Sequence, residues 1–176
     1  MDAATKKALR LQAEAVIEKL ERNNMAGYYV SSKAEVAAKG AELLHDGDTV
    51  AVGGSMSLAE TGVMDLLRSG RYRFLDRYAP GLSAEEVQDI YRQSFFADAY
   101  LCSSNAVTMN GELYNVDGNS NRVAAICYGP KSVIMVVGCN KIVRDIPAAI
   151  TRVKRRSAPA NAIRLHCQTP CAQTGS

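Results

Sequence analysis

The sequence predicts an α/β protein of three layers, in which a mostly parallel central sheet is flanked by helices and accompanied by a short antiparallel hairpin. Three observations predict it. Apolar runs at 49–52, 99–102 and 132–137 have the length of buried strands, and helical patterns lie between them. Each run ends in glycine or small polar residues, which is typical of the carboxyl ends of parallel strands. Asn110-Gly111 is a typical two-residue turn of a β-hairpin.

The first half of the chain alternates helical and strand-like patterns. Apolar residues at helical spacing predict a long amphipathic helix over 3–24 and further helices over 33–45 and 58–67. The run 25–30 is compatible with a short strand. Gly62 falls inside the last of these helices, where glycine costs about 1 kcal/mol relative to alanine. Such a cost indicates either close packing or the approach of a ligand.

The second half continues the alternation. We expect the following elements: a strand at 72–76, a helix at 83–94 capped by Ser83, the hairpin 106–109 with 112–116, a helix at 122–128, a strand at 132–137 and a helix at 145–155. The 132–137 run is the most apolar, so we expect a central, fully buried strand there. The elements make a single domain over 1–156. Residues 157–176 lack periodicity, which predicts an irregular surface segment.

Bulk composition excludes several classes of protein. A net charge of +3, three Phe and no Trp argue against nucleic-acid binding. No apolar run approaches the roughly 20 residues that cross a bilayer, and no signal peptide is visible, so we expect a cytoplasmic protein without a membrane partner. Five cysteines, an odd number, argue against a disulfide framework. No motif identifies a cofactor.

The strand ends suggest a ligand site. Polar or glycine residues follow the three clearest strands at 53–57, 103–105 and 138–141, and parallel strands bring such ends to one crevice. Glycines followed by a helix N-terminus suit a phosphate or a carboxylate. A tight turn with a serine cap explains the same residues equally well. Neither a Walker loop nor a GxGxxG motif is present.

Two carboxylates are candidates for proton transfer, Asp117 and Glu60, and Arg122 is the best anion clamp. Asp117 has a second interpretation, as the cap of the following helix. Most lysines are simply solvated, which is the alternative for Lys131 and Lys141. The complete set of candidate ligand-binding residues is Gly53, Gly54, Ser55, Ser57, Thr61, Ser103, Ser104, Asn105, Gly118, Asn119, Asn121, Arg122, Lys131 and Lys141. The residues that we expect to line one cavity are Gly53, Gly54, Ser55, Ser103, Asn105, Asp117, Asn119 and Lys141.

The C-terminal segment carries Cys167 and Cys171 with His166 beside them. A closed metal site needs about four ligands, so these three residues are too few and we expect no tightly bound metal.

Four stretches together resemble the LUD-domain family, named for lactate utilisation, and its short stand-alone members in particular. They are Gly53–Gly62, Ala97–Ala106, Asn115–Ala124 and Tyr128–Val143, in matching order. The resemblance implies a fold similar to ribose-5-phosphate isomerase, glucosamine-6-phosphate deaminase and CoA transferases. It also implies an association with a multi-subunit system that oxidises L-lactate to pyruvate. Short members typically continue past a Thr-Pro-Cys segment into further cysteines, whereas this sequence stops at Ser176, which suggests a shortened tail.

Two classes of function remain open. As an enzyme, the protein would move a proton or a group on a small hydroxy acid, keto acid or sugar phosphate, in the manner of an isomerase or a CoA transferase. As a non-catalytic protein, it would bind an organic anion as an accessory or regulatory subunit. A small anionic metabolite is the expected ligand in either case. We expect a homodimer, with the N-terminal helix as its likeliest contact, and other lactate-utilisation subunits as further partners.

Overall fold

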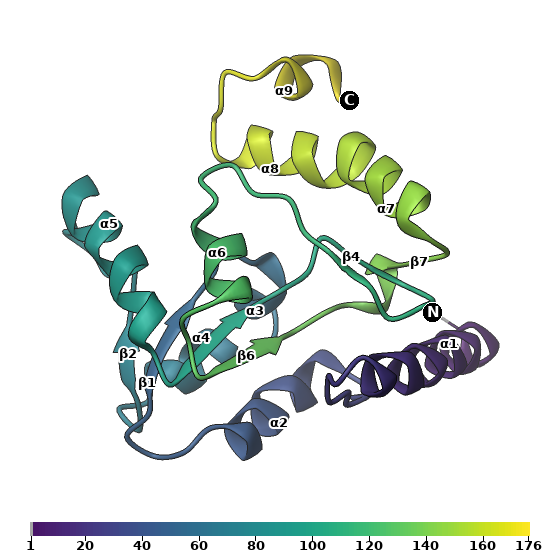
Figure 1. The fold of residues 1–176 in the computed structure, drawn as a ribbon, viewed down its shortest axis with the longest axis horizontal. Coiled ribbons are helices and arrows are strands. Elements are labelled where there is room, and N and C mark those ends of the chain that lie inside the picture. Colours follow the sequence, from purple (N-terminus) through teal and green to yellow (C-terminus); the bar gives the residue numbers. More distant parts are fainter. Residues whose placement is uncertain (1) are drawn as a thin grey trace. The chain divides into compact units, whose positions relative to one another are not determined.

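The computed structural model describes residues 2–176, which divide into two compact units (Figure 1). Unit 1 comprises Met1–Tyr29, Ser104–Val116 and Gly138–Ser176, and unit 2 comprises Val30–Ser103 and Asp117–Val137. Each unit is therefore built from segments that lie far apart in the sequence.

Unit 2 contains a parallel four-stranded sheet. Its strands are β1 (Thr49–Val52), β2 (Arg73–Leu75), β3 (Ala99–Cys102) and β6 (Ser132–Met135), in the order β2-β1-β3-β6. All three pairings are parallel, with Val50 opposite Ala99 and Tyr100 opposite Val133. The α/β class and the mainly parallel sheet are thus confirmed. Because the strands are parallel, their carboxyl ends lie along one border of the sheet, across the strand direction, which we call the carboxyl edge.

Helices cover both faces of this sheet. Alternate residues of a strand point to opposite faces. Val50, Val52 and Leu101 pack with Leu58 and Leu67 in one core cluster, whereas Ala51, Tyr100 and Cys102 pack with Ala125 in another. The helices of unit 2 are α2 (Val36–Leu43), α3 (Met56–Ala59), α4 (Val63–Leu67), α5 (Ala84–Gln93) and α6 (Asn121–Cys127), with 3-10 turns at Lys33–Glu35 and Ser94–Phe96. The first core cluster takes residues from α3 and α4 and the second from α6, which confirms the three layers.

Unit 1 combines helices with a small mixed sheet. The sheet has the order β5-β4-β7, from β4 (Ala106–Thr108), β5 (Leu113–Tyr114) and β7 (Ile142–Val143). Its helices are α1 (Ala3–Arg22), α7 (Ile146–Arg152), a π-helical turn at Val153–Ser157, α8 (Ala158–Arg164) and α9 (Pro170–Thr174), with a 3-10 turn at Cys139–Lys141. Strands β4 and β5 pair antiparallel, which confirms the predicted hairpin.

The strand at 132–137 is not central, which corrects the prediction. It forms β6 only over Ser132–Met135, at the edge of the sheet, and its side chains are half-buried or exposed. An apolar run indicates that a strand packs against covering helices. It does not indicate whether other strands pair with it on one side or on both. The chain passes from this edge strand into unit 1 at Gly138.

Three local predictions also fail. The helix predicted over 58–67 is split into α3 and α4 because Gly62 adopts a left-handed φ of 71° that ends the first helix. Residues 25–30 form no strand. The segment from 157, predicted to be irregular, contains α8 and α9 instead. Pro159 fits the first turn of α8, where no intrahelical donor is needed, and it is buried together with Ala162.

Candidate functional site

The loop after β1 is bound tightly to the neighbouring strand. The Gly53 amide donates to the Leu101 carbonyl oxygen at 2.9 Å. A Cβ on Gly53 would lie 2.9 Å from the Tyr100 Oη and 3.1 Å from Arg122 Cγ and Cδ, so this position needs glycine for packing. Ser55 then caps α3 by accepting from the Leu58 amide at 3.4 Å. The loop therefore does form a tight turn with a serine cap, which is one of its two interpretations.

Asp117 and Arg122 are held by the start of α6. The Asp117 Oδ2 accepts from the amides of Arg122 at 2.8 Å and Val123 at 3.1 Å, so Asp117 caps this helix. Within residues 2–176, its Oδ1 takes no hydrogen bond. Arg122 is 8% exposed, and its Nη1 donates to the Ser103 carbonyl oxygen at 2.9 Å. Both interpretations of Asp117 stay compatible with this geometry, because one oxygen caps and the other does not.

Tyr100 supplies a hydroxyl that the sequence did not suggest. Its ring is buried in the sheet, and its Oη reaches the Gly53 loop. Burial raises the pKa of the Tyr100 phenol far above its ordinary value, and the positive charges of Arg77 and Arg122 oppose that rise only in part. The group is accordingly a neutral hydroxyl, able to donate a hydrogen bond, throughout the physiological pH range.

Arg77 and Tyr78 form the other side of this loop, and the sequence reasoning missed both. A Cβ on Gly54 would lie 3.6 Å from the Tyr78 Oη and 3.9 and 4.0 Å from Nη1 and Nη2 of Arg77. The signal that could have found them is position, since both lie in the turn after β2 at the carboxyl edge. We call Gly53, Gly54, Arg77, Tyr78, Tyr100, Asp117 and Arg122 the strand-end cluster.

The remaining candidates in unit 2 are more scattered. Glu60 lies exposed beyond α3 and pairs with Lys33. The Thr61 hydroxyl donates to the Ser57 carbonyl oxygen at 2.7 Å, within its own helical turn. Lys131 lies before β6 at the opposite edge of the sheet, where its Nζ donates to the Asp98 Oδ1 at 2.7 Å. Gly118 and Asn119 are exposed in the turn between Asp117 and α6, and Asn121 is the first residue of that helix.

Three candidates belong to unit 1. The Ser104 hydroxyl donates to the Ala106 carbonyl oxygen at 2.7 Å, and the Asn105 Oδ1 accepts from the Val116 amide at 2.9 Å. Lys141 ends the 3-10 turn Cys139–Lys141. That these residues and the Gly53 loop line one cavity stays a prediction.

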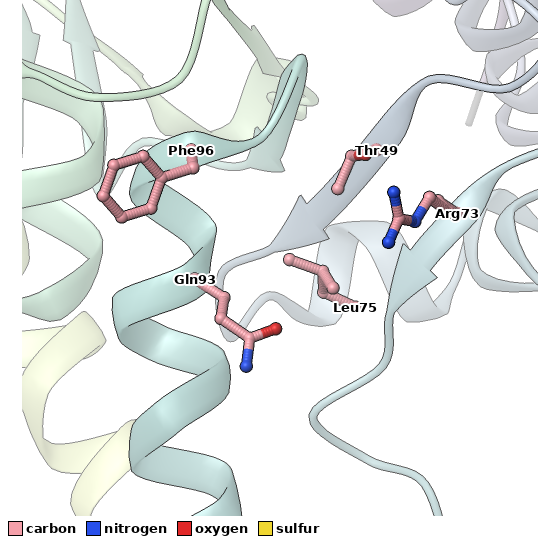
Figure 2. A pocket seen from close by; sticks show the side chains of 5 residues that line it. All are labelled: Thr49, Arg73, Leu75, Gln93 and Phe96. Atoms are coloured by element: carbon pink, nitrogen blue, oxygen red, sulfur yellow. The ribbon is translucent and has the colours of Figure 1, made fainter.

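Two surface hollows lie elsewhere in unit 2. One, of about 260 Å³, is lined by Thr49, Arg73, Leu75, Gln93 and Phe96, and Figure 2 shows the Gln93 and Leu75 side chains in the space between α5 and the strands. The other, of about 360 Å³, is lined by Leu43, His45, Asp48, Asp98, Lys131 and Ser132. Apart from Lys131, these hollows contain none of the predicted residues. The second lies at the amino ends of the strands, on the side of the sheet opposite to the strand-end cluster.

No group of three or more His, Cys, Asp or Glu side chains in residues 2–176 is placed to hold a metal ion. Cys167 is exposed and Cys171 partly buried. None of the helices within residues 2–176 combines the length and the apolar character needed to cross a bilayer.

Comparison with known proteins gives one finding. The family model described as the LUD domain matches residues 13–176, nearly the whole chain. The match includes every residue of the strand-end cluster. No curated protein and no solved structure matches the chain.

Proposed function

Because this chain belongs to the LUD-domain family, we propose that it serves lactate-related organic-acid metabolism by binding a small organic anion at the strand-end cluster. The family supports a function related to lactate utilisation. The ligand, the site and the chemistry are our proposal. A carboxylate or a phosphate is the expected ligand group.

One observation carries the proposal: three separate stretches of unit 2 bring arginine and tyrosine side chains to the Gly53-Gly54 loop. The Tyr100 hydroxyl from β3 and the Arg122 side-chain carbons from α6 lie beside Gly53, while the terminal nitrogens of Arg77, from the turn after β2, lie beside Gly54. Two guanidinium groups against the single Asp117 carboxylate leave one positive charge. A monoanion held by guanidinium and hydroxyl donors would neutralise it.

The same residues favour binding over catalysis. Asp117 already uses one oxygen to cap α6, and Glu60 is exposed and paired with Lys33, so each candidate base has a structural partner. An accessory or regulatory ligand-binding subunit is therefore the favoured form of the proposal. An enzyme resembling a sugar-phosphate isomerase or a CoA transferase is the alternative.

A thermal-shift screen tests the proposal. L-lactate, pyruvate, sugar phosphates and coenzyme A would be compared with glycerol and with choline chloride at matched ionic strength. A ligand at 100 times its Kd stabilises the native state by about 2.7 kcal/mol. In a chain of this size that raises Tm by roughly 5–10 °C. If no anion raises Tm beyond the two controls, the proposal is wrong.

Replacement of Asp117 separates the two forms of the proposal. Asp117→Asn keeps an oxygen that can cap α6 but removes the charge, so we expect near-native stability and retained ligand binding. Asp117→Ala removes the cap and should cost about 1 kcal/mol in unfolding free energy. If the bound anion is also a substrate, turnover that vanishes in Asp117→Asn while binding persists would establish the enzyme form. An absence of turnover in wild type and variants alike would support the binding protein.

A further inference from the structure

Arg77 carries donors that the described part of the chain leaves without an acceptor. It is partly buried, and within residues 2–176 its guanidinium forms neither a hydrogen bond nor an ion pair. Its carbon Cζ lies over the rings of Tyr78 and Tyr91, 5.0 and 4.7 Å from their centroids. Ring faces offer no oxygen acceptor, so these two contacts leave the guanidinium N–H groups able to donate to a ligand. Five donors in a partly buried place are therefore ready for an oxyanion.

The turn around Arg77 is fixed by its neighbours. Asp76 accepts from the Arg68 Nε at 2.8 Å through Oδ2 and from the Tyr78 amide at 2.9 Å through Oδ1. The Ala79 amide closes the turn on the Asp76 carbonyl oxygen at 3.2 Å. The charge of Asp76 is thus satisfied by Arg68, and it leaves Arg77 to face Gly54. A guanidinium held by a turn and two rings loses little freedom when it binds a ligand.

Gly54 lies beside this donor pair. The position that a Cβ would occupy lies 3.9 and 4.0 Å from the two terminal nitrogens of Arg77, so the guanidinium end of the side chain lies next to Gly54. The Tyr78 hydroxyl, which forms no hydrogen bond within residues 2–176, lies 3.6 Å from the same point. Two parallel N–H groups fit the two oxygens of a carboxylate or of a phosphate. Gly54 itself is exposed, so a ligand can reach the space.

We propose that Arg77, stacked on Tyr78 and Tyr91, is the ligand-contacting clamp that binds two oxygens of a carboxylate or phosphate over Gly54. This inference rests on the proposed function, because it names the residue that takes the charged group of the same ligand. Arg122 contributes positive charge from inside the fold. Arg77 contributes the direct contact.

Titration calorimetry with L-lactate, pyruvate and inorganic phosphate as separate probes tests this assignment. Arg77→Gln removes the fork and the charge, and Arg77→Lys keeps the charge but loses the paired donors. Arg73→Gln is the matched control, because Arg73 is an exposed arginine at the start of β2, the strand that precedes Arg77, and its replacement changes the net charge by the same amount. Circular dichroism and Tm of each unligated variant establish that the fold is kept.

We expect Arg77→Gln to weaken binding of the best probe by about 10- to 100-fold, the range for hydrogen bonds to charged groups. The affinity of Arg77→Lys for the probe should lie between those of Arg77→Gln and wild type. Arg73→Gln should bind the probe as tightly as wild type does. The probe that binds more tightly tells a carboxylate ligand from a phosphate. Suppose that wild type binds a probe and that Arg77→Gln either binds it equally well or loses no more affinity than Arg73→Gln. The assignment of Arg77 as the clamp is then wrong, whereas the proposed function is not contradicted. If wild type binds none of the anions in the calorimeter or in the thermal-shift screen, both are wrong.

Discussion

Replacing Gly53 with alanine should destabilise the protein, whereas the same change at the adjacent Gly54 should stabilise it slightly. The two positions differ in the space over their Cα atoms. A methyl group on Gly53 would lie 2.9 Å from the Tyr100 Oη and 3.1 Å from Arg122 side-chain carbons. Neither neighbour can yield easily, because the Tyr100 ring is 2% exposed and Arg122 is bonded to Ser103.

The magnitudes follow from packing and chain entropy. Overpacking a well-packed site costs about 1–3 kcal/mol. Any Gly→Ala change restricts the unfolded chain, which stabilises the native state by about 0.4–1 kcal/mol where the backbone allows alanine. We therefore expect Gly53→Ala to lose about 1–2 kcal/mol of unfolding free energy. The backbone of Gly54 lies outside the left-handed region, and the nearest atom to an added Cβ would be 3.6 Å away. Gly54→Ala should therefore raise the free energy of unfolding by the entropic contribution alone.

Thermal and urea unfolding followed by circular dichroism measure both variants. Each kcal/mol moves Tm by about 2–4 °C in a chain of this length. Tyr100→Phe in the Gly53→Ala background provides an internal check, because removal of the hydroxyl relieves the shorter contact and should recover part of the loss. A Gly53→Ala protein as stable as Gly54→Ala would refute the reasoning, since it would mean that Tyr100 and Arg122 move aside at no cost.

Two further predictions concern other parts of the chain. Gly111→Ala should lower the free energy of unfolding by about 3 kcal/mol, because Gly111 has a φ of +79° and the new methyl group would lie 2.8 Å from the backbone of α1. Gly47→Ala should lower it by only about 1 kcal/mol, because Gly47 has a similar φ of +87° but open space around it. Urea unfolding measures both, and equal losses would show that the backbone of α1 moves aside without cost. The hydrogen bond from Lys131 is the main cause that lowers the pKa of Asp98 in the folded protein. The stability from this lowered pKa is fully present above the ordinary aspartate range near pH 4 and is lost as pH falls through the folded pKa. The stability difference between wild type and Lys131→Met, measured by urea unfolding across pH, should accordingly be largest at neutral pH and shrink in acid; a difference independent of pH would contradict this origin.

Local signals in the sequence were sufficient for elements in both units. Ser83 with Glu86 forms the capping box that begins α5, and Asn110-Gly111 closes the hairpin between β4 and β5, because caps and turns depend on neighbours within a few residues. The failures were those of distant context. Gly62 looked like a glycine inside a helix, and only its surroundings decide that it ends one helix and begins another.

The candidate site divides in the same way. Gly53 was predictable as a strand-end residue, and Asp117 and Arg122 were predictable from the polar turn before a helix. In unit 2 the Arg122 side chain lies beside Gly53, and Asp117 accepts from the Arg122 amide. Arg77 and Tyr100 were not predictable as partners of that loop. An arginine after a short strand and a tyrosine inside an apolar one carry no local mark of function.

What the sequence by itself determined was the alternation of strands and helices, the edge at which the polar loops gather, and membership of the LUD-domain family. The tertiary structure alone decided that β6 lies at the edge of its sheet and that the Arg77 guanidinium faces Gly54. The physical reason is the range of the forces involved. Propensity, capping and amphipathic spacing act within a few residues of the chain, whereas strand order and the direction of a long side chain depend on groups brought together only by folding.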